Sequence, residues 1–384
     1  MNLFFFNYSH DLALANGSSN YILPRHVRMM EHDLMPMAAF CAEKGDAIAV
    51  DESLTKTCTE FYKPLCNDIE FVSTTTLPAD KRQLRPWGID FRLERILQKA
   101  GLPYPFTSKD IEHLHRLSSR IVASELLHSL RTALPHLPLC GESTACYTEA
   151  QVAQVVSFHP STLLKAPWSG SGRGLRFASR TIEPPLTGWC RNILQAQGAL
   201  MVEPIYNKVT DIAVEFMAEP SGQINYLGLS LFRTTDRCTY LGNTIAPQAV
   251  LEQEAFGEIG IGVLHEVTDH IGRLLETTID RHYTGPLGVD MMICRDKDGL
   301  KLHPCVEINF RNTMGILALH LERFVSNRCT GIFQMRYEHT ETALQTYAAA
   351  LPTPRFDSDG KLCQGCLLLT PILADTRYIA WLSV

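Results

Sequence analysis

Apolar residues recur along the chain with the two-residue period of strands and the three-to-four-residue period of helices. The N-terminal part predicts a buried strand over 3–7, a helix over 29–43 that is broken or bent at Pro36, and a second strand over 46–50. A strand, a helix and a strand in this order are typical of a small parallel α/β unit. Helical periodicity then returns over 91–100 and 111–130.

The remaining two thirds of the sequence predicts mostly strands. They are expected over 162–167, 175–178, 199–205, 212–217 and 226–232. A long helix is expected over 255–282, followed by a β-hairpin over 285–311. The C-terminal part predicts helices over 316–327 and about 333–350, and a closing hairpin built from 361–370 and 378–384.

The hairpin over 285–311 carries the densest set of oxygen-bearing side chains. Its predicted turn, Asp296-Lys-Asp-Gly299, contains the Asp-Gly pair that favours a tight hairpin. A two-residue turn places Asp290 opposite Cys305, diagonally across from Glu307, and Glu307 shares a strand face with Asn309. Two carboxylates and an amide oxygen suit Mg²⁺. The alternative interpretation is an acidic face in contact with solvent.

A glycine-rich turn joins the two strands predicted around residue 170. The sequence Trp168-Ser-Gly-Ser-Gly-Arg-Gly174 follows Lys165 and returns into a strand. It differs from a Walker A loop, which opens a helix and ends in Lys-Ser/Thr, and from the kinase order, in which the lysine comes after the glycines. Backbone N–H groups of such a turn can bind a triphosphate, with the lysine as a point charge. A plain hairpin is the alternative.

Polar residues at strand ends complete the candidate sites. Glu203 ends an apolar strand and Asp211 opens the next, where an adenine edge and ribose hydroxyls could be bound. A satisfied polar group at a strand terminus explains Glu203 equally well. His10, Asp11 and Arg25 lie in loops after strands, the usual ligand rim of a parallel sheet, although loop capping is an alternative role.

Composition excludes several classes of function. Of the 384 residues, 45% are hydrophobic and 20% are charged, as in soluble globular proteins, and the length predicts two or three domains. The net charge of −6 and the absence of a basic run argue against nucleic-acid binding. No apolar stretch is long enough to cross a membrane, and the N-terminus lacks a signal-peptide pattern, so we expect a cytoplasmic protein. The twelve cysteines are scattered, and Cys363 and Cys366 form the single CxxC, which favours reduced thiols over zinc.

The order of these motifs resembles the ATP-grasp superfamily. A strand lysine, a glycine hairpin, an apolar strand with glutamate, an acidic residue, a long helix and D…E-x-N on a hairpin follow one another over about 110–330. The resemblance implies an α/β (α+β) protein in which ATP binds between two α+β subdomains, preceded by an N-terminal α/β domain. The implied segments are 1–108 (N-terminal domain), 109–200 (lysine and glycine hairpin), 201–330 (metal-binding hairpin) and 331–384 (C-terminal extension).

The resemblance also implies roles for individual residues. The phosphates would be bound by Lys165, Gly170, Gly172, Arg173 and Gly174. Adenine would lie by Glu203 and Ile205, ribose by Asp211, and one or two Mg²⁺ ions (Mn²⁺ is possible) by Asp290, Glu307 and Asn309. Arg311 would lie near the transferred phosphate, with Arg233 as a second basic residue. The chain departs from the frequent N-P-R pattern with Asn309-Phe310-Arg311, and Pro204 removes one backbone donor from the adenine segment.

The implied activity is that of a ligase. ATP would activate a carboxylate as an acyl-phosphate, and an amine or similar nucleophile would attack it, so the expected partners are small molecules. Such chemistry requires positioning and charge neutralisation rather than a catalytic nucleophile. A small-molecule kinase using the same ATP site and a nucleotide-binding regulator without turnover are the alternatives. The sequence does not indicate the substrates or the oligomeric state.

Overall fold

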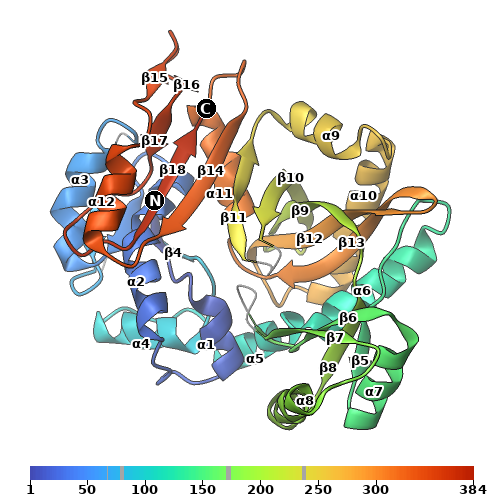
Figure 1. The fold of residues 1–384 in the computed structure, drawn as a ribbon. Coiled ribbons are helices and arrows are strands. Elements are labelled where there is room, and N and C mark those ends of the chain that lie inside the picture. The colour runs from blue at the N-terminus through green and yellow to red at the C-terminus, as the bar shows by residue number, and fades with distance from the viewer. Residues whose placement is uncertain (67, 78–81, 170–173, 236–238) are drawn as a thin grey trace. The chain divides into compact units, whose positions relative to one another are not determined.

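The computed structural model describes residues 1–66, 68–77, 82–169, 174–235 and 239–384. The chain forms two compact units: unit 1 contains 1–111, 241–247 and 311–384, and unit 2 contains 112–240 and 248–310. Figure 1 shows the elements of each unit by colour and label. The predicted boundary near 108 lies three residues from the end of the first segment of unit 1. The segment 331–384, predicted as an extension, belongs to the same unit as the N-terminal sheet.

The first half of unit 1 is a parallel sheet in the order β3-β2-β1-β4. Its strands are β1 (Asn2–Phe5), β2 (Ala47–Val50), β3 (Glu70–Ser73) and β4 (Gln83–Pro86). The helices of this part are α1 (His10–Asn16), α2 (Arg25–Leu34), α3 (Thr55–Tyr62) and α4 (Phe91–Lys99), with 3-10 turns η1 (Met35–Cys41) and η2 (Glu52–Leu54). The predicted parallel α/β unit is confirmed. The predicted break at Pro36 falls where α2 gives way to η1.

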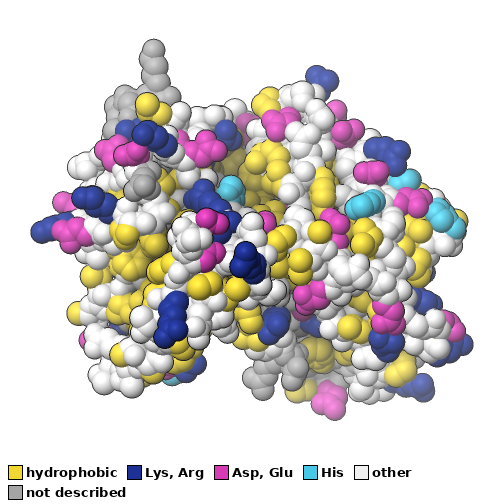
Figure 2. All heavy atoms as spheres, turned by 90° about the horizontal axis from the view of Figure 1, so that it is seen from above, with side chains coloured by type: hydrophobic (Ala, Val, Ile, Leu, Met, Phe, Trp, Pro, Cys, Tyr) yellow, Lys and Arg dark blue, Asp and Glu magenta, His cyan; other side chains and the backbone are white. Residues whose placement is uncertain are grey.

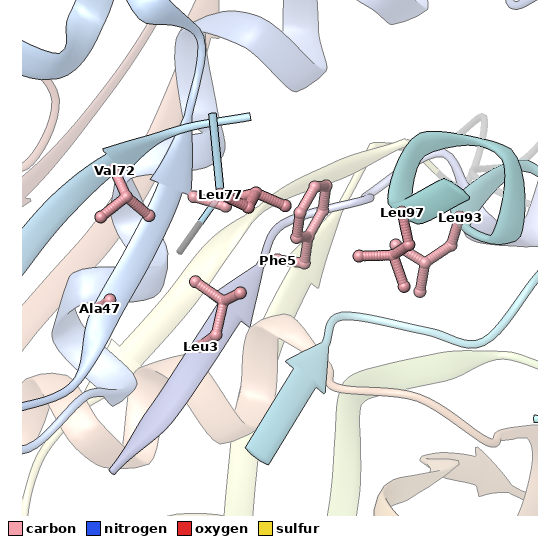
Figure 3. Packing of buried hydrophobic residues seen from close by; sticks show 8 residues of the cluster. Leu3, Phe5, Ala47, Val72, Leu77, Leu93 and Leu97 are labelled. Atoms are coloured by element: carbon pink, nitrogen blue, oxygen red, sulfur yellow. The ribbon is translucent and has the colours of Figure 1, made fainter. Parts of the chain in front are cut away.

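Apolar side chains from alternate positions of this sheet pack against α4. Figure 3 shows Leu3 and Phe5 of β1 between Val72 on one side and Leu93 and Leu97 of α4 on the other. Leu93 and Leu97 are four residues apart and therefore lie on one face of the helix. Neither side chain is more than 1% exposed. This core fixes the carboxyl ends of β1 and β4, from which the polar loops of unit 1 begin.

The second half of unit 1 contains antiparallel strands that are neighbours in the order β11-β14-β18-β17. Its elements are β11 (Tyr240–Ile245), β14 (Gly331–Tyr337), β17 (Cys366–Leu368), β18 (Tyr378–Ser383), α11 (Met314–Leu321), η3 (Glu322–Phe324) and α12 (Glu341–Ala349), with a small pair β15 (Arg355–Phe356) and β16 (Leu362–Gln364). The helix predicted over 333–350 is wrong in its first part, which is strand β14. The Thr340 side chain accepts a hydrogen bond from Ala343 N and starts α12 there.

Unit 2 contains two antiparallel sheets. The first has the order β5-β8-β6-β7, and the second has the order β13-β12-β9-β10. Their strands are β5 (Thr144–Cys146), β6 (Ser161–Lys165), β7 (Leu175–Ser179), β8 (Leu200–Pro204), β9 (Lys208–Ala218), β10 (Ile224–Thr234), β12 (Gly285–Asp296) and β13 (Gly299–Asn309). The helices are α6 (Arg120–Ala133), α7 (Glu149–Phe158), α8 (Pro184–Gln197), α9 (Gln248–Phe256) and α10 (Ile261–Ile279), and α5 (Ser108–Leu117) leads in from unit 1.

Two helices predicted as continuous are each divided into two. The helix over 111–130 is interrupted before α6, where Ser119 has extended backbone and its hydroxyl accepts from Ile121 N. The helix over 255–282 is interrupted between α9 and α10, where Gly260 has a φ of 106°, a conformation that favours glycine. In both places the local backbone conformation ends the helix, although the spacing of apolar residues predicts that it continues.

Helices α9 and α10 cover one face of the second sheet of unit 2. The buried side chains of that face include Val214, Leu229 and Val289, and the buried side chains of α10 include Val267 and Ile271. Because strand side chains alternate between faces, the odd positions of β9 and the even positions of β12 point to the opposite face. The candidate site lies there.

Basic and acidic side chains are interspersed on the face of the molecule that Figure 2 shows. Among the described residues of this face, dark blue and magenta groups alternate with yellow ones rather than gathering by sign. None of the helices formed by the described residues is both long and apolar enough to cross a membrane.

Candidate nucleotide and metal site

The hairpin β12–β13 has the predicted turn but a different register beyond it. Asp296 pairs with Gly299 as expected, yet Asp290 pairs directly with Glu307 rather than with Cys305. An irregularity between Asp290 and Met292 inserts two extra residues of β13. The predicted opposition of Asp290 and Cys305 is therefore wrong. Pro304, which has no N–H for the ladder, lies within the irregularity and was its signal in the sequence.

The corrected register arranges the candidate residues in three rows across β9, β12 and β13. The first row is Asp211, Met292 and His303; the second is Ala213, Asp290 and Glu307; the third is Glu215, Gly288 and Asn309. Neighbours within a row are about 4.5–5.5 Å apart and rows about 7 Å apart. Asp290, Glu307 and Asn309 therefore share one face, as predicted. Glu215 is buried on the same face and accepts a hydrogen bond from Ser230 Oγ at 2.9 Å.

Arg120 at the start of α6 binds the central carboxylate of this face. Its Nη2 donates to both oxygens of Glu307, at 2.8 and 2.9 Å. Its Nη1 donates to Ala166 O and Ser169 Oγ, both at 2.8 Å, at the base of the glycine turn. The Arg120 side chain is 7% exposed. A cation is thus fixed between the acidic face and the loop that was predicted to bind phosphates.

Lys165 and Glu203 form a buried ion pair in the first sheet of unit 2. Lys165 ends β6, and its Nζ is 2.5 Å from Glu203 Oε2 on the neighbouring strand β8. Ser143 Oγ donates to the other oxygen of Glu203 at 3.0 Å. Both charged side chains are less than 8% exposed. The lysine and glutamate predicted to contact phosphate and adenine are therefore direct partners.

The glycine turn joins β6 and β7 as a hairpin, with Lys165 paired to Leu175. Gly170, Gly172 and Arg173 lie outside the described residues. Gly174 has a φ of 70°, and a Cβ there would lie 2.7 Å from Ser169 Cβ, so the position requires glycine. Its carbonyl accepts from Ala166 N at 2.9 Å, which closes the base of the turn.

Of the remaining predicted residues of unit 2, only Asp211 lies on the same face of the sheet as the acidic set. Asp211 binds Lys208 Nζ at 2.5 Å and Thr234 Oγ1 at 2.8 Å on the site face. Ile205 follows β8 and is 47% exposed. Arg233 is exposed and follows Phe232, which pairs with Asp211, so alternation directs Arg233 to the opposite face of the sheet. The structure thus does not bring Arg233 together with the acidic set.

His303 lies in the first row, close to the Lys165–Glu203 pair. Its ring contacts Tyr206 edge-on, with 5.5 Å between ring centres, and it is 1% exposed. Burial lowers the pKa of His303 to about 4. The Glu203 carboxylate acts to raise this pKa, and the Lys165 ammonium acts to lower it further. Neither ring nitrogen has a hydrogen-bond partner among the described residues. The imidazole is therefore a neutral polar group in the interior of unit 2.

Acidification is expected to destabilise the protein through His303. The unfolded ring, with a pKa of 6.5, takes up a proton before the folded ring, with a pKa of about 4. Stability is therefore complete above pH 6.5 and falls as the pH falls to about 4, by about 3 kcal/mol in total. Urea unfolding of wild type and His303→Phe between pH 7.5 and 4 measures this. The variant should lose less stability, and the exposed-site control His265→Gln should follow wild type; equal pH slopes for wild type and His303→Phe would contradict the assignment.

Gly141 is expected to be intolerant of a side chain. Its φ is 115°, and a Cβ would lie 2.7 Å from the Nε2 and Cδ2 atoms of His303. Gly141→Ala should lower the free energy of unfolding by about 1–3 kcal/mol. Chemical denaturation of Gly141→Ala, His303→Ala and the double variant separates the two causes: the clash is relieved in the double variant, and the backbone strain remains. A double variant with strictly additive losses would show that the ring contact contributes nothing.

The polar loops of unit 1 meet at the topological switch point of its parallel sheet. Strand β1 leads to β2 on one side, and β4 lies on the other side, which is where open α/β sheets bind ligands. His10 is buried there, with Nδ1 3.7 Å from Asp90 Oδ2 and Nε2 4.0 Å from Asp11 Oδ1. Arg311 Nε donates to Asp11 Oδ1 at 2.9 Å. Arg25 begins α2 and is exposed.

Several residues of both sites were missed in the sequence. Arg120, Ser143 and Glu215 come to the unit 2 site from segments without a motif, and His303 comes from the predicted hairpin. Asp90 and Trp87 lie at the switch point of unit 1. Only Glu215 had a usable signal, because it continues the every-second-residue series begun by Asp211 in one strand. Cys363 and Cys366 flank the turn at Gly365, and no group of three His, Cys, Asp or Glu residues suited to a metal occurs in the described part of the chain.

Comparisons with known proteins show the fold. No protein-family model and no curated protein matches the sequence. A pyruvate carboxylase of Rhizobium etli is similar in structure, with a TM-score of 0.53 and 11% identity over 100% of this chain and 36% of the other. The structure is also similar to a biotin carboxylase of Campylobacter jejuni, with a TM-score of 0.49 and 12% identity over 100% of this chain and 87% of the other. A third similar structure is an N5-carboxyaminoimidazole synthetase of Staphylococcus aureus complexed with ADP, with a TM-score of 0.48 and 11% identity over 100% of this chain and 92% of the other. The chain has the ATP-grasp fold, as predicted.

Proposed function

We propose that this chain, which has the ATP-grasp fold, is an ATP- and Mg²⁺-dependent ligase. It would activate a carboxylate as an acyl-phosphate and join it to an amine or a similar nucleophile. The observation that carries this proposal is the shared face of β12 and β13, where Asp290, Glu307 and Asn309 are in register and Arg120 binds Glu307. Acidic oxygens and a fixed cation on one face are what binding and transfer of a phosphoryl group require.

The donor set of this face fits a magnesium ion. Asp290 and Glu307 are directly paired and Asn309 lies one row farther, so the set offers three oxygen ligands from two adjacent strands. Hard cations that keep water and phosphate ligands need no more than this from the protein. Burial raises the pKa of the nearby Cys305 thiol, and the charges of Asp290 and Glu307 add to the shift, which supports an anionic environment here. A bound Mg²⁺ would neutralise charge on the phosphates.

The phosphates would lie between this face and the glycine turn. Lys165 and Arg120 supply positive charge from two elements, and Arg120 already joins Ala166 and Ser169 of the turn to Glu307. The turn was predicted to close over a triphosphate, and its described end, Gly174, has the backbone conformation of a tight return. In this proposal Glu203 releases Lys165 from their ion pair when a nucleotide binds.

The carboxylate and nucleophile would be recognised by unit 1. Its switch point offers His10, Asp11 and Arg311, and the Trp87 indole N–H there has no hydrogen-bond partner among the described residues. Arg311, proposed to lie near the transferred phosphate, is held by Asp11 rather than left to solvent. Both signs of charge are present, as a carboxylate and an amine require.

A ligand-binding experiment followed by a substrate screen tests the function. Thermal shift with ATP, with and without Mg²⁺, is compared for wild type, Lys165→Ala and the exposed-site control Lys297→Ala. Ligand at about 100 times its Kd adds roughly 2.7 kcal/mol of stability, enough to shift the melting temperature by a few degrees. A Mg²⁺-dependent shift in wild type and control, and its loss in Lys165→Ala, supports the site. No shift with any nucleotide would refute the proposal.

The reaction itself is tested with hydroxylamine as a surrogate nucleophile. A ligase forms a hydroxamate from ATP, hydroxylamine and one member of a panel of organic carboxylates that includes the amino acids. A kinase would instead phosphorylate a hydroxyl compound and form no hydroxamate, and a regulator would bind ATP without turnover. Release of ADP without hydroxamate for every carboxylate would therefore favour the kinase alternative.

A further inference from the structure

We propose that the outer edge of β7, together with the groove beside it, binds an extended acidic peptide segment of a partner protein. The segment adds to the first sheet of unit 2 as a further antiparallel strand. Its acidic side chains face Arg176 and Arg180, and an apolar side chain between them enters the groove. The inference uses none of the residues assigned to ATP or metal and does not depend on the proposed function.

Strand β7 has backbone hydrogen-bonding groups that point away from the sheet. It is the last strand in the order β5-β8-β6-β7, and among the described residues it pairs with β6 alone. The hydrogen bond from Ala166 N to Gly174 O sets the alternation of this ladder, so Phe177 and Ser179 are at positions that do not bond to β6. Their N–H and C=O groups point outward. Peptides that add a strand to a sheet bind to an edge of this kind.

A groove runs between this edge and the N-terminal half of α8. Its volume is about 420 Å³, and its walls include Arg176 and Ala178 of β7 and Leu186 and Trp189 of α8. The Arg176 guanidinium lies over the Trp189 ring, 5.3 Å from the ring centre. Because Ala178 is small, an apolar side chain opposite it on an added strand can enter the groove. On the other face of β7 the same strand would cover Phe177, which is 54% exposed.

The charges around the groove favour an acidic occupant. Arg176 lies on β7, and Arg180 follows the last residue of the strand; both are exposed. They are four positions apart, so the strand period directs them to the same face as Ala178. Glu183, at the start of α8, also lines the groove. Two arginines against one carboxylate leave an excess of positive charge, which is complementary to acidic side chains.

The same arginines disfavour a second copy of this chain as the occupant. Two copies of β7 could bond only through their outward-facing residues, in an antiparallel register. With Phe177 opposite itself, each Arg176 lies diagonally across from the arginines of the other copy. With Arg176 or Ala178 opposite itself, Arg176 directly faces an arginine. Like charges at such positions destabilise paired strands, so a chain of different sequence fits better.

The probe is a fluorescein-labelled peptide, Thr-Glu-Thr-Leu-Thr-Glu-Thr, in which leucine lies opposite Ala178 and the glutamates face the two arginines. Its binding to the full chain is followed by fluorescence anisotropy. We expect saturable binding with a Kd below about 1 mM, and about tenfold weaker binding to Arg176→Glu combined with Arg180→Glu. The lysine peptide Thr-Lys-Thr-Leu-Thr-Lys-Thr should show the reverse preference. The control Arg328→Glu, which changes an exposed arginine of unit 1, should bind both peptides as wild type does.

Methylation of the peptide backbone tests strand addition on the unaltered protein. In an antiparallel pair the N–H groups of the two inner threonines face Phe177 and Ser179, whereas those of the leucine and the glutamates point away from β7. N-methylation of the two inner threonines should therefore abolish binding. N-methylation of the leucine and one glutamate should leave it intact.

Three outcomes would overturn the inference. They are no saturable binding of the glutamate peptide up to about 1 mM, equal affinity of the glutamate and lysine peptides for wild type, and an equal effect of the two methylation patterns. The last two comparisons need no protein variant, so they decide the question even if the double variant does not fold. A wild-type dimer in sedimentation that is lost in Ser179→Pro, which removes an outward N–H, would assign the edge to a second copy and also overturn the inference.

Discussion

Glu307→Gln is expected to reduce Mg²⁺-dependent ATP turnover by about a thousandfold. The glutamine keeps the size of the side chain but removes the charge at the centre of the acidic face, where Glu307 pairs with Asp290 and binds Arg120. Metal stabilisation of transferring phosphate amounts to several kcal/mol, and each 1.4 kcal/mol is a factor of ten in rate. Turnover is measured with the carboxylate identified by the hydroxamate screen, and metal affinity by Mn²⁺ titration in the presence of ATP.

The control for this variant is Glu258→Gln, which removes a carboxylate from an exposed ion pair with Arg295. It should leave turnover and Mn²⁺ affinity unchanged, because exposed pairs contribute little. Arg120 retains its bonds to Ala166 and Ser169 in Glu307→Gln, so the fold should persist, which circular dichroism checks. Turnover within tenfold of wild type in a folded Glu307→Gln protein would remove Glu307 from the metal site.

Lys165→Ala is expected to lose two properties at once. It removes the proposed phosphate contact, and it leaves the carboxylate of Glu203, which is 5% exposed, without its cation. Removal of one partner of a buried pair costs about 3–5 kcal/mol of folding free energy. The variant should therefore melt several degrees lower than wild type and show no Mg²⁺ATP-dependent shift. The ligand-induced shift, and not the melting temperature itself, reports the nucleotide site.

A double variant separates these two effects. Lys165→Met combined with Glu203→Gln removes both charges of the pair and keeps Ser143 as a partner of residue 203. Stability should return to within about 1 kcal/mol of wild type, whereas MgATP binding should remain absent. Restored binding in the double variant would mean that Lys165 serves the fold alone and that the nucleotide contacts other groups.

Several structural features of the candidate site could be predicted because their signals are local. The Asp296–Gly299 turn, the pairing of Lys165 at the start of a glycine hairpin and the shared face of Glu307 and Asn309 each depend on a few consecutive residues. Their order along the chain then indicated the ATP-grasp fold, although no single motif is specific. Strand alternation and turn chemistry do not depend on the rest of the molecule, which is why these predictions were confirmed.

The errors arose where contacts between distant parts of the chain determine the local structure. Arg120 reaches Glu307 across 187 positions of sequence, and nothing near it marks it as a site residue. The first part of the helix predicted over 333–350 became a strand because β11 and β18 pair with it on both sides. The Asp290–Cys305 pairing failed because the register was extrapolated through Pro304. Tertiary pairing outweighed local preference in each of these cases.

The irregular register of β13 affects how this chain is aligned with others. Counted back from the turn, a regular hairpin would place position 305 opposite Asp290, whereas here position 307 stands there. A gapless alignment with a regular hairpin would therefore superpose Cys305 on the other chain's acidic residue and count the carboxylate as lost. A two-residue insertion next to Pro304 restores the correspondence. Searches for further chains of this kind should allow a gap at that place.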